Sequence, residues 1–204
     1  MATLGSMLRD IVDELPRGDS SITAIAQAKL LNAIDFYTTD RFWFNEKQTT
    51  LTTTPSLAYY SWPADLLETD SVIATDSAGT KYELTPITYQ EMNAFDAGNS
   101  YGQPCWYSTY NKQFRLYPVP DATYTIIVSH QYSPATLSAT TDSNAWTVEA
   151  EALIRSRALK NLYFRFKDKE NAAFYQEIES QEYERLKRQT DKLLSTNTIS
   201  GSGF

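Results

Sequence analysis

Residues 70–85 have the sequence DSVIATDSAGTKYELT, in which Asp76-Ser77-Ala78-Gly79 separates two short runs. A cluster of Asp, Ser and Gly between such runs is typical of a tight turn. The runs contain Thr, Val, Ile and Tyr, which favour extended backbone. The segment therefore predicts a β-hairpin formed by residues 70–75 and 80–85.

Similar short runs, broken by Pro, Gly and Asp, extend from Arg41 to about residue 134. Further strands are predicted where apolar residues alternate, which happens at Phe42 with Phe44, Ala58 with Tyr60, Phe114 with Leu116, and Tyr124 with Ile126 and Val128 in a strand over 122–132. One short helix is expected at 89–97, because Thr88-Tyr89-Gln90-Glu91 forms a capping box and Gly98 supplies a stop. Residues 41–134 are thus interpreted as a β-rich module.

The residues before this module have the spacing of a helical hairpin. One apolar face runs along residues 3–15 and ends at Pro16 and Gly18. A second helix is expected from a cap at Asp19–Ser21 to about Thr38.

The residues after the module return to helix. A Ser/Thr-rich connector at 135–144 leads to a helix from about Thr147, a break at Lys167-Asp168-Lys169, and a last helix over 171–194. The apolar stripe of that last helix is thin and is interrupted by Glu182. Such a helix is mostly solvated or packs against another chain, so we expect a subunit interface along Tyr175, Ile178, Leu186 and Leu193.

These elements predict an α+β fold in which a helical bundle carries an inserted β-rich module. The expected organisation is a helical hairpin at 1–40, the module at 41–134, C-terminal helices at 135–194 that complete the bundle, and an extended tail at 195–204.

Composition excludes several classes of function. The 204 residues include 42% hydrophobic and 21% charged residues, without an apolar run long enough for a membrane span or a secretory pattern at the start. We therefore expect a soluble protein without a membrane partner. The chain has one cysteine, Cys105, which argues against a disulfide framework and a cysteine-rich zinc site. It has one histidine, His130, which argues against His-rich metal centres. No metal or other cofactor is therefore expected.

Charge is distributed unevenly along the chain. Residues 1–148 carry a net charge of −8, from 8 Lys and Arg against 16 Asp and Glu. Residues 149–204 carry +1, from 10 against 9, which brings the chain to −7. An acidic surface repels the phosphate backbone, so adhesive binding to DNA is disfavoured, whereas passing contact with DNA stays open.

The sequence selects no catalytic residue. Carboxylate pairs such as Asp65 with Glu68, or Glu68 with Asp70, are interpreted as solvated surface, because nothing distinguishes them among 25 acids. His130 is interpreted as a satisfied structural histidine and Cys105 as a small apolar residue. The aromatic residues between 36 and 132 indicate core packing, with sugar stacking or a protein interface as alternatives.

Several phrases of this sequence, taken in order, resemble the head-to-tail adaptor proteins of tailed bacteriophages. The phrases are YSWPADLLE at 60–68, LTPITYQEM at 84–92, Gly102-Gln103-Pro104 followed by Tyr107, and LYPVPD at 116–121. The preceding KLLNAI at 29–34 and FWFN at 42–45 are similar to the start of the related tail tubular A and tail accessory proteins.

This resemblance implies a structural virion protein without enzymatic activity. Such proteins form a ring, typically of twelve copies, at the head-tail junction between the portal and a downstream tail or nozzle protein. The ring continues the channel for double-stranded DNA without binding it specifically, and its assembly is expected in the host cytoplasm. In such proteins a C-terminal segment extends onto the portal. The resemblance therefore implies that the tail residues Ser195, Ile199 and Phe204 dock on the portal in this chain.

Two alternatives remain at this stage. One is a tail completion or stopper ring that lies farther from the portal. The other is a carbohydrate-binding or hydrolytic module that uses the Tyr and Trp surface together with an Asp/Glu pair.

Overall fold

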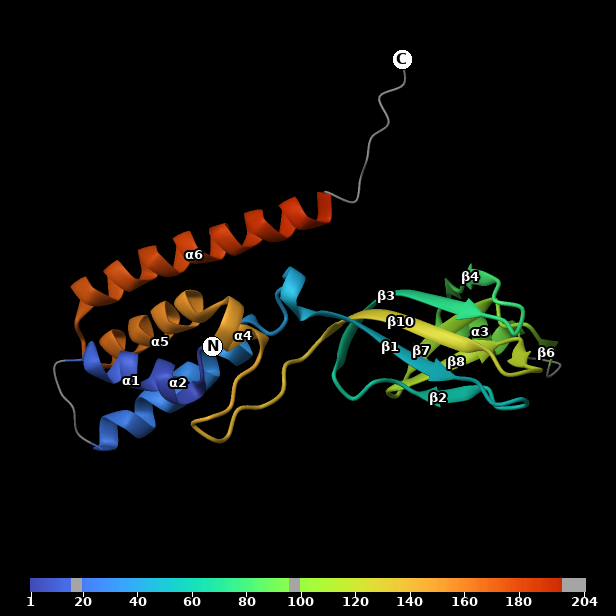
Figure 1. Ribbon diagram of the computed structural model, residues 1–204, viewed down its shortest axis with the longest axis horizontal. Helices are drawn as coiled ribbons and strands as arrows, with labels where there is room; N and C mark the ends of the chain where they lie inside the picture. The colour runs from blue at the N-terminus through green and yellow to red at the C-terminus, as the bar shows by residue number, and fades with distance from the viewer. Residues whose placement is uncertain (16–19, 96–99, 196–204) are drawn as a thin grey trace, which may run out of the picture. The chain divides into compact units, whose positions relative to one another are not determined.

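The computed structural model describes residues 1–15, 20–95 and 100–195. The chain divides into two compact units: a helical unit, formed by residues 1–45 and the chain from Ser133 onward, and a β unit, Glu46–Tyr132. Figure 1 shows helices throughout the first unit and strands throughout most of the second. The predicted α+β class is confirmed.

The helical unit is built on one apolar core. Its elements are α1 (Leu4–Asp13), α2 (Ser20–Tyr37), the short 3-10 helix η1 (Trp43–Asn45), α4 (Ala145–Glu149), α5 (Glu151–Arg165) and α6 (Lys169–Ser195). Trp146 is fully buried in this core, together with residues of the four other α-helices, and Trp43 and Phe44 of η1 pack against it. The unit therefore combines the two ends of the chain in one hydrophobic cluster.

Polar caps set where two of these helices begin. The Thr3 side chain accepts a hydrogen bond from the Ser6 backbone, and the Ser6 side chain accepts one from the Thr3 backbone. Asn144 and Thr147 form the same reciprocal pair at α4. Both pairs satisfy amides that the first helical turn leaves without partners.

In its described residues, 46–95 and 100–132, the β unit contains three sheets and one helix. Its elements are β1 (Glu46–Thr52), β2 (Tyr59–Ser61), β3 (Leu66–Thr75), β4 (Lys81–Glu83), β5 (Thr85–Pro86), α3 (Tyr89–Phe95), β6 (Tyr101–Gly102), β7 (Trp106–Tyr110), β8 (Gln113–Tyr117), β9 (Val119–Pro120) and β10 (Thr125–Tyr132). The sheet orders are β1-β10-β3-β4, β2-β8-β7-β5 and β6-β9. Apolar residues from both four-stranded sheets form a second, separate core.

The hairpin predicted at 70–85 is confirmed. Strands β3 and β4 pair antiparallel, and the Asp76 amide donates to the Thr80 carbonyl at 3.1 Å across the turn. Gly79 has φ +86°, a conformation that glycine adopts without steric cost. The capping box of α3 is also present, with the Glu91 amide donating to Thr88 Oγ1 and the Thr88 amide donating to Glu91 Oε2.

The start of the β-rich module was predicted wrongly. Phe42 and Phe44 alternate as in a strand, but Trp43–Asn45 forms η1, and the Phe42 amide donates to Asn45 Oδ1 at 2.8 Å. The Phe42 ring lies 5.6 Å from Trp146, in the core of the helical unit. Aromatic packing therefore keeps residues 41–45 with the helices, and the compact β unit covers 46–132 rather than 41–134.

The C-terminal helices differ from expectation in detail. One helix was predicted from Thr147, whereas α4 and α5 are separated at Ala150, whose backbone is not helical. The predicted break between the last two helices is confirmed at Lys167, which has φ +61°. Asp168 then accepts hydrogen bonds from the backbone and side chain of Asn171 in the first turn of α6.

The predicted stop at Pro16 and Gly18, the cap at Asp19 and the stop at Gly98 lie outside the described residues.

Candidate functional site: a groove on the helical unit

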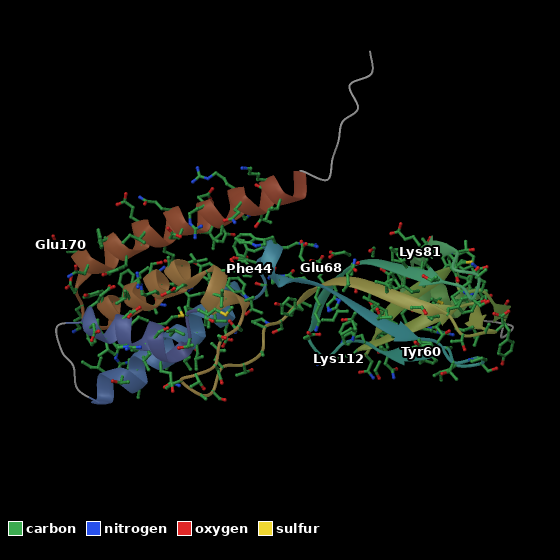
Figure 2. All side chains as sticks on the ribbon, in the orientation of Figure 1. Phe44, Tyr60, Glu68, Lys81, Lys112 and Glu170 are labelled. Atoms are coloured by element: carbon green, nitrogen blue, oxygen red, sulfur yellow. The ribbon has the colours of Figure 1, made fainter. Side chains whose placement is uncertain are left out.

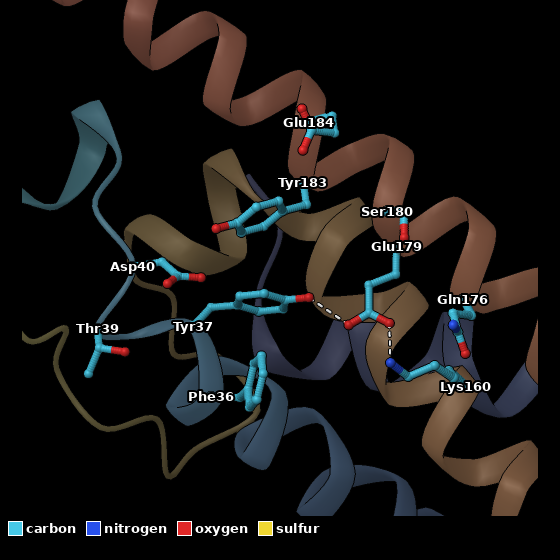
Figure 3. A pocket seen from close by; sticks show the side chains of 10 residues that line it. All are labelled: Phe36, Tyr37, Thr39, Asp40, Lys160, Gln176, Glu179, Ser180, Tyr183 and Glu184. Atoms are coloured by element: carbon cyan, nitrogen blue, oxygen red, sulfur yellow. Dashed lines mark hydrogen bonds and ion pairs between the residues drawn. The ribbon is translucent and has the colours of Figure 1, made fainter.

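A groove of about 650 Å³ lies between the end of α2, α5 and α6 (Figure 3). Aromatic side chains and charged side chains share its walls. Residues that define it are Phe36, Tyr37, Asp40, Lys160, Glu179 and Tyr183.

The carboxylate of Glu179 connects the three helices around this groove. Tyr37 Oη donates to Glu179 Oε1 at 2.6 Å, and Arg157 Nη1 lies 2.6 Å from the same oxygen. Lys160 Nζ pairs with the other carboxylate oxygen, as Figure 3 also shows. Because Glu179 is buried, its charge needs these partners.

The electrostatics of the network fix its protonation. Burial raises the pKa of the Glu179 carboxyl, but the hydrogen bonds from Lys160, Tyr37 and Arg157 together outweigh this effect, so the pKa is lowered. Burial and the hydrogen bond to Glu179 raise the pKa of Tyr37. At neutral pH the carboxylate is therefore charged and the phenol remains the donor.

Aromatic rings form the other wall of the groove. Tyr37 lies 5.8 Å from Tyr183 and stacks at 6.3 Å on the buried Trp146. The Phe36 ring is 56% exposed, and the guanidinium carbon of Arg157 lies 3.2 Å from its centroid. A cation over an aromatic face holds that ring in place. The groove thus offers a rigid apolar edge at its rim.

This arrangement is suited to binding rather than to acid-base chemistry. Two cations neutralise Glu179, and its depressed pKa makes it a poor proton donor or acceptor near neutral pH. Within the described ranges 1–15, 20–95 and 100–195, no group of three His, Cys, Asp or Glu residues is arranged to hold a metal ion. Over the same part of the chain, no helix has the length and apolar character of a membrane span.

The predicted interface residues of α6 mostly contact their own chain. Leu186 is fully buried in the helical core, and Tyr175 stacks on Tyr163 at 5.5 Å while its hydroxyl donates to Glu14 Oε2. Ile178 is half-buried, and Leu193 is exposed. Leu186 thus has no surface left for a neighbouring copy, whereas an interface role for the other three stays a prediction.

The predicted docking tail is largely beyond what the structure describes. Ser195 is the last residue of α6, whereas Ile199 and Phe204 lie outside the described residues.

Two single residues of the β unit differ from their interpretation. His130 is buried and its Nδ1 lies 3.2 Å from the Val128 carbonyl, but Nε2 has no hydrogen-bond partner in the described ranges and lies 3.8 Å from Asp65 Oδ1. It is only half satisfied. Cys105 is exposed rather than packed as a small apolar residue.

The carboxylate pairs lie on the surface of the β unit. Asp65 pairs with Lys47 at 2.7 Å, whereas Glu68 and Asp70 are exposed on β3. The structure therefore does not bring them together as an enclosed acid-base pair.

Sequence reasoning missed the Glu179 network. The stripe of α6 that packs inward contains Ala172, Tyr175, Glu179 and Leu186, so a carboxylate occupies a core-facing position. Such a residue in line with apolar neighbours at helical spacing signals a buried ion pair, and the i, i+3 cations Arg157 and Lys160 are the matching signal on α5.

The sequence pattern of the SU10 adaptor protein family matches residues 2–200, which includes both units. The chain belongs to this family. It is a bacteriophage adaptor protein with a structural role at the head-tail junction. No curated protein matches the chain.

Proposed function

We propose that copies of this adaptor form a ring, of twelve subunits, between the portal and a downstream tail or nozzle protein. The ring continues the DNA channel through which the genome is retained and later ejected. The role is structural and without catalysis, and the ring is assembled in the host cytoplasm. The observation that carries this proposal is the family match over residues 2–200.

The physical properties of the chain support a channel that does not hold DNA. Twelve copies of net charge −7 bring −84 to one ring. Those acidic side chains that face the lumen repel the phosphates of the DNA and prevent the DNA from adhering to the channel wall as it passes.

Neighbouring subunits then need apolar contacts, because a ring closes through heterologous interfaces that involve two different surfaces of each copy. Exposed apolar side chains of the helical unit, among them Phe36 and Leu193, provide such contacts. We propose that Ile199 and Phe204 of the C-terminal tail anchor the ring on the portal.

Electron microscopy of native particles, combined with cross-linking to the portal, tests this function. We expect a twelvefold ring of this chain at the genome exit and cross-links between residues 195–204 and the portal. A ring that cross-links only to tail proteins would assign the subunit to a stopper or completion ring instead. A solitary subunit away from the exit would overturn the proposal.

A further inference from the structure

The β unit has a concave site of its own, of about 290 Å³. Tyrosines from three elements and polar residues of the β7–β8 hairpin line it: Tyr59, Tyr89, Tyr110, Asn111, Gln113 and Arg115. Lys112, labelled in Figure 2, occupies the turn of this hairpin. We call this site the tyrosine pocket.

Arg115 is held firmly in the tyrosine pocket. It is 7% exposed, and its guanidinium carbon lies 5.4 Å from the Tyr59 centroid and 5.8 Å from the Tyr89 centroid. Its Nη1 donates to Asn93 Oδ1 at 2.5 Å. A buried guanidinium in a fixed orientation presents a positive charge at little additional entropic cost.

An exposed but ordered ring, that of Tyr110, also lines the pocket. Tyr110 is 63% exposed, yet it stacks on Tyr89 with centroids 4.4 Å apart and planes at 17°. It precedes a two-residue turn in which Asn111 and Lys112 have φ +50° and +56°, and it pairs with Gln113 in the strand register. The narrow turn fixes where the ring lies.

This composition is typical of the energetic centre of a protein interface. Tyrosine and arginine dominate such centres because they combine a large contact area, hydrogen bonding and few rotatable bonds. An ordered pocket loses little conformational entropy when a partner segment enters it.

Charge indicates the chemistry of the occupant. Among the residues that the structure describes, the pocket is lined by one cation and no acid, whereas the β unit as a whole holds four Lys and Arg against nine Asp and Glu, a net charge of −5. The like charges of neighbouring copies of such a unit repel each other, and this repulsion is reduced where an acidic segment meets a cation. The tyrosine pocket offers that complementarity on the unit itself.

We propose that the tyrosine pocket receives an acidic segment of the β unit of a second copy of this chain. A carboxylate of that segment lies toward Arg115, and the tyrosine rings exclude water from the ion pair that the two groups form. This contact is heterologous, as a closed ring requires. The inference rests on the proposed ring, to which it adds the contact surface between neighbouring β units.

Photo-cross-linking in the native particle tests the occupant. The probe is p-benzoylphenylalanine in place of Tyr110, and the matched control carries it in place of Tyr101, which is 59% exposed in the same unit but does not line the pocket. We expect irradiation to give a covalent dimer only for position 110, with the attached peptide from an acidic segment within 46–132.

The outcomes separate this inference from the proposed function. A tail or portal protein attached at position 110, or no adduct in particles that retain the ring, overturns the occupant while the ring stands. Equal dimer yields at both positions overturn the specific role of the pocket. Particles that lack this chain at the junction overturn the proposed function itself.

A charge substitution provides a second measurement. Tyr110→Glu adds an acid beside Arg115 and should reduce incorporation of the adaptor into particles about tenfold, with partial recovery at high salt. Tyr101→Glu, the matched control, should leave incorporation unchanged, and Tyr110→Phe should retain it. Circular dichroism verifies that the variants fold, and normal incorporation of a folded Tyr110→Glu chain would contradict the proposal.

Discussion

The helical unit and the β unit close their cores in different ways. The helical unit joins residues 1–45 with the chain after Ser133, and the Tyr37–Glu179 hydrogen bond connects positions 142 apart in sequence. The β unit is one continuous stretch, and its first and last strands, β1 and β10, pair at Glu46 with Gln131. Strand β10 also pairs with β3, whereas the consecutive strands β3 with β4 and β7 with β8 form hairpins. Ionic contacts between side chains of distant helices thus help to complete one unit, whereas backbone pairing between distant strands completes the other.

This difference shows how an inserted module can leave its host fold intact. Because β1 and β10 are neighbours, the two connections leave the β unit side by side. The host helices need only a short bridge between residues 45 and 133. Stability of each unit should therefore depend mainly on its own core.

The largest change that tests this comparison is the separation of the two units. A chain of residues 46–132 alone should fold with a cooperative β transition, and a chain in which a short Gly/Ser linker replaces 46–132 should keep its helices, because each unit has its own buried cluster. Circular dichroism and thermal unfolding of both chains check this. If either chain is unfolded, the two cores depend on each other and the comparison fails.

A smaller effect is expected from Glu179→Gln in the helical unit. The substitution leaves Arg157 and Lys160 without their carboxylate and should lower the free energy of unfolding by about 3 kcal/mol at pH 7. Denaturant unfolding measures it. The matched control Glu177→Gln alters an exposed acid of the same helix and should change stability by less than about 0.5 kcal/mol.

The same variant should lose part of the acid dependence of stability. The folded pKa of Glu179 lies below its unfolded value, which is about 4.3 for a free glutamate. The contribution of ionised Glu179 to the free energy of unfolding is therefore fully present above its unfolded pKa and disappears as the pH falls through its folded pKa. Wild type should approach the variant in stability under strong acid. A constant difference between them from neutral to acidic pH would show that the ion network does not titrate as proposed.

The smallest effect is expected from Asp65→Asn in the β unit. Its partner Lys47 lies at 2.7 Å, but the two side chains are 31% and 47% exposed, so the pair should contribute about 0.5 kcal/mol and less at high salt. Unfolding of the isolated β unit measures this directly. A loss above about 2 kcal/mol would indicate that Asp65 compensates the buried His130 as well, and the β unit would then resemble the helical unit in its dependence on ionic contacts.

Local patterns were sufficient to predict much of the fold. The Asp76–Gly79 turn and the Thr88–Glu91 capping box act over four residues, so their hydrogen bonds can be read from the sequence. The alternation of Phe42 and Phe44 was misleading, because a strand and an aromatic turn that packs on Trp146 have the same pattern over three residues.

The sequence alone established the order of the helical, β-rich and helical segments, the acidic character of the chain and the resemblance to phage adaptors, because periodicity, composition and ordered phrases are properties of neighbouring residues. Only the tertiary structure brought Tyr37, Arg157 and Glu179 together, and placed Arg115 between Tyr59 and Tyr89. Burial and contact between distant residues depend on how the elements pack, and no local pattern in a single sequence contains that information.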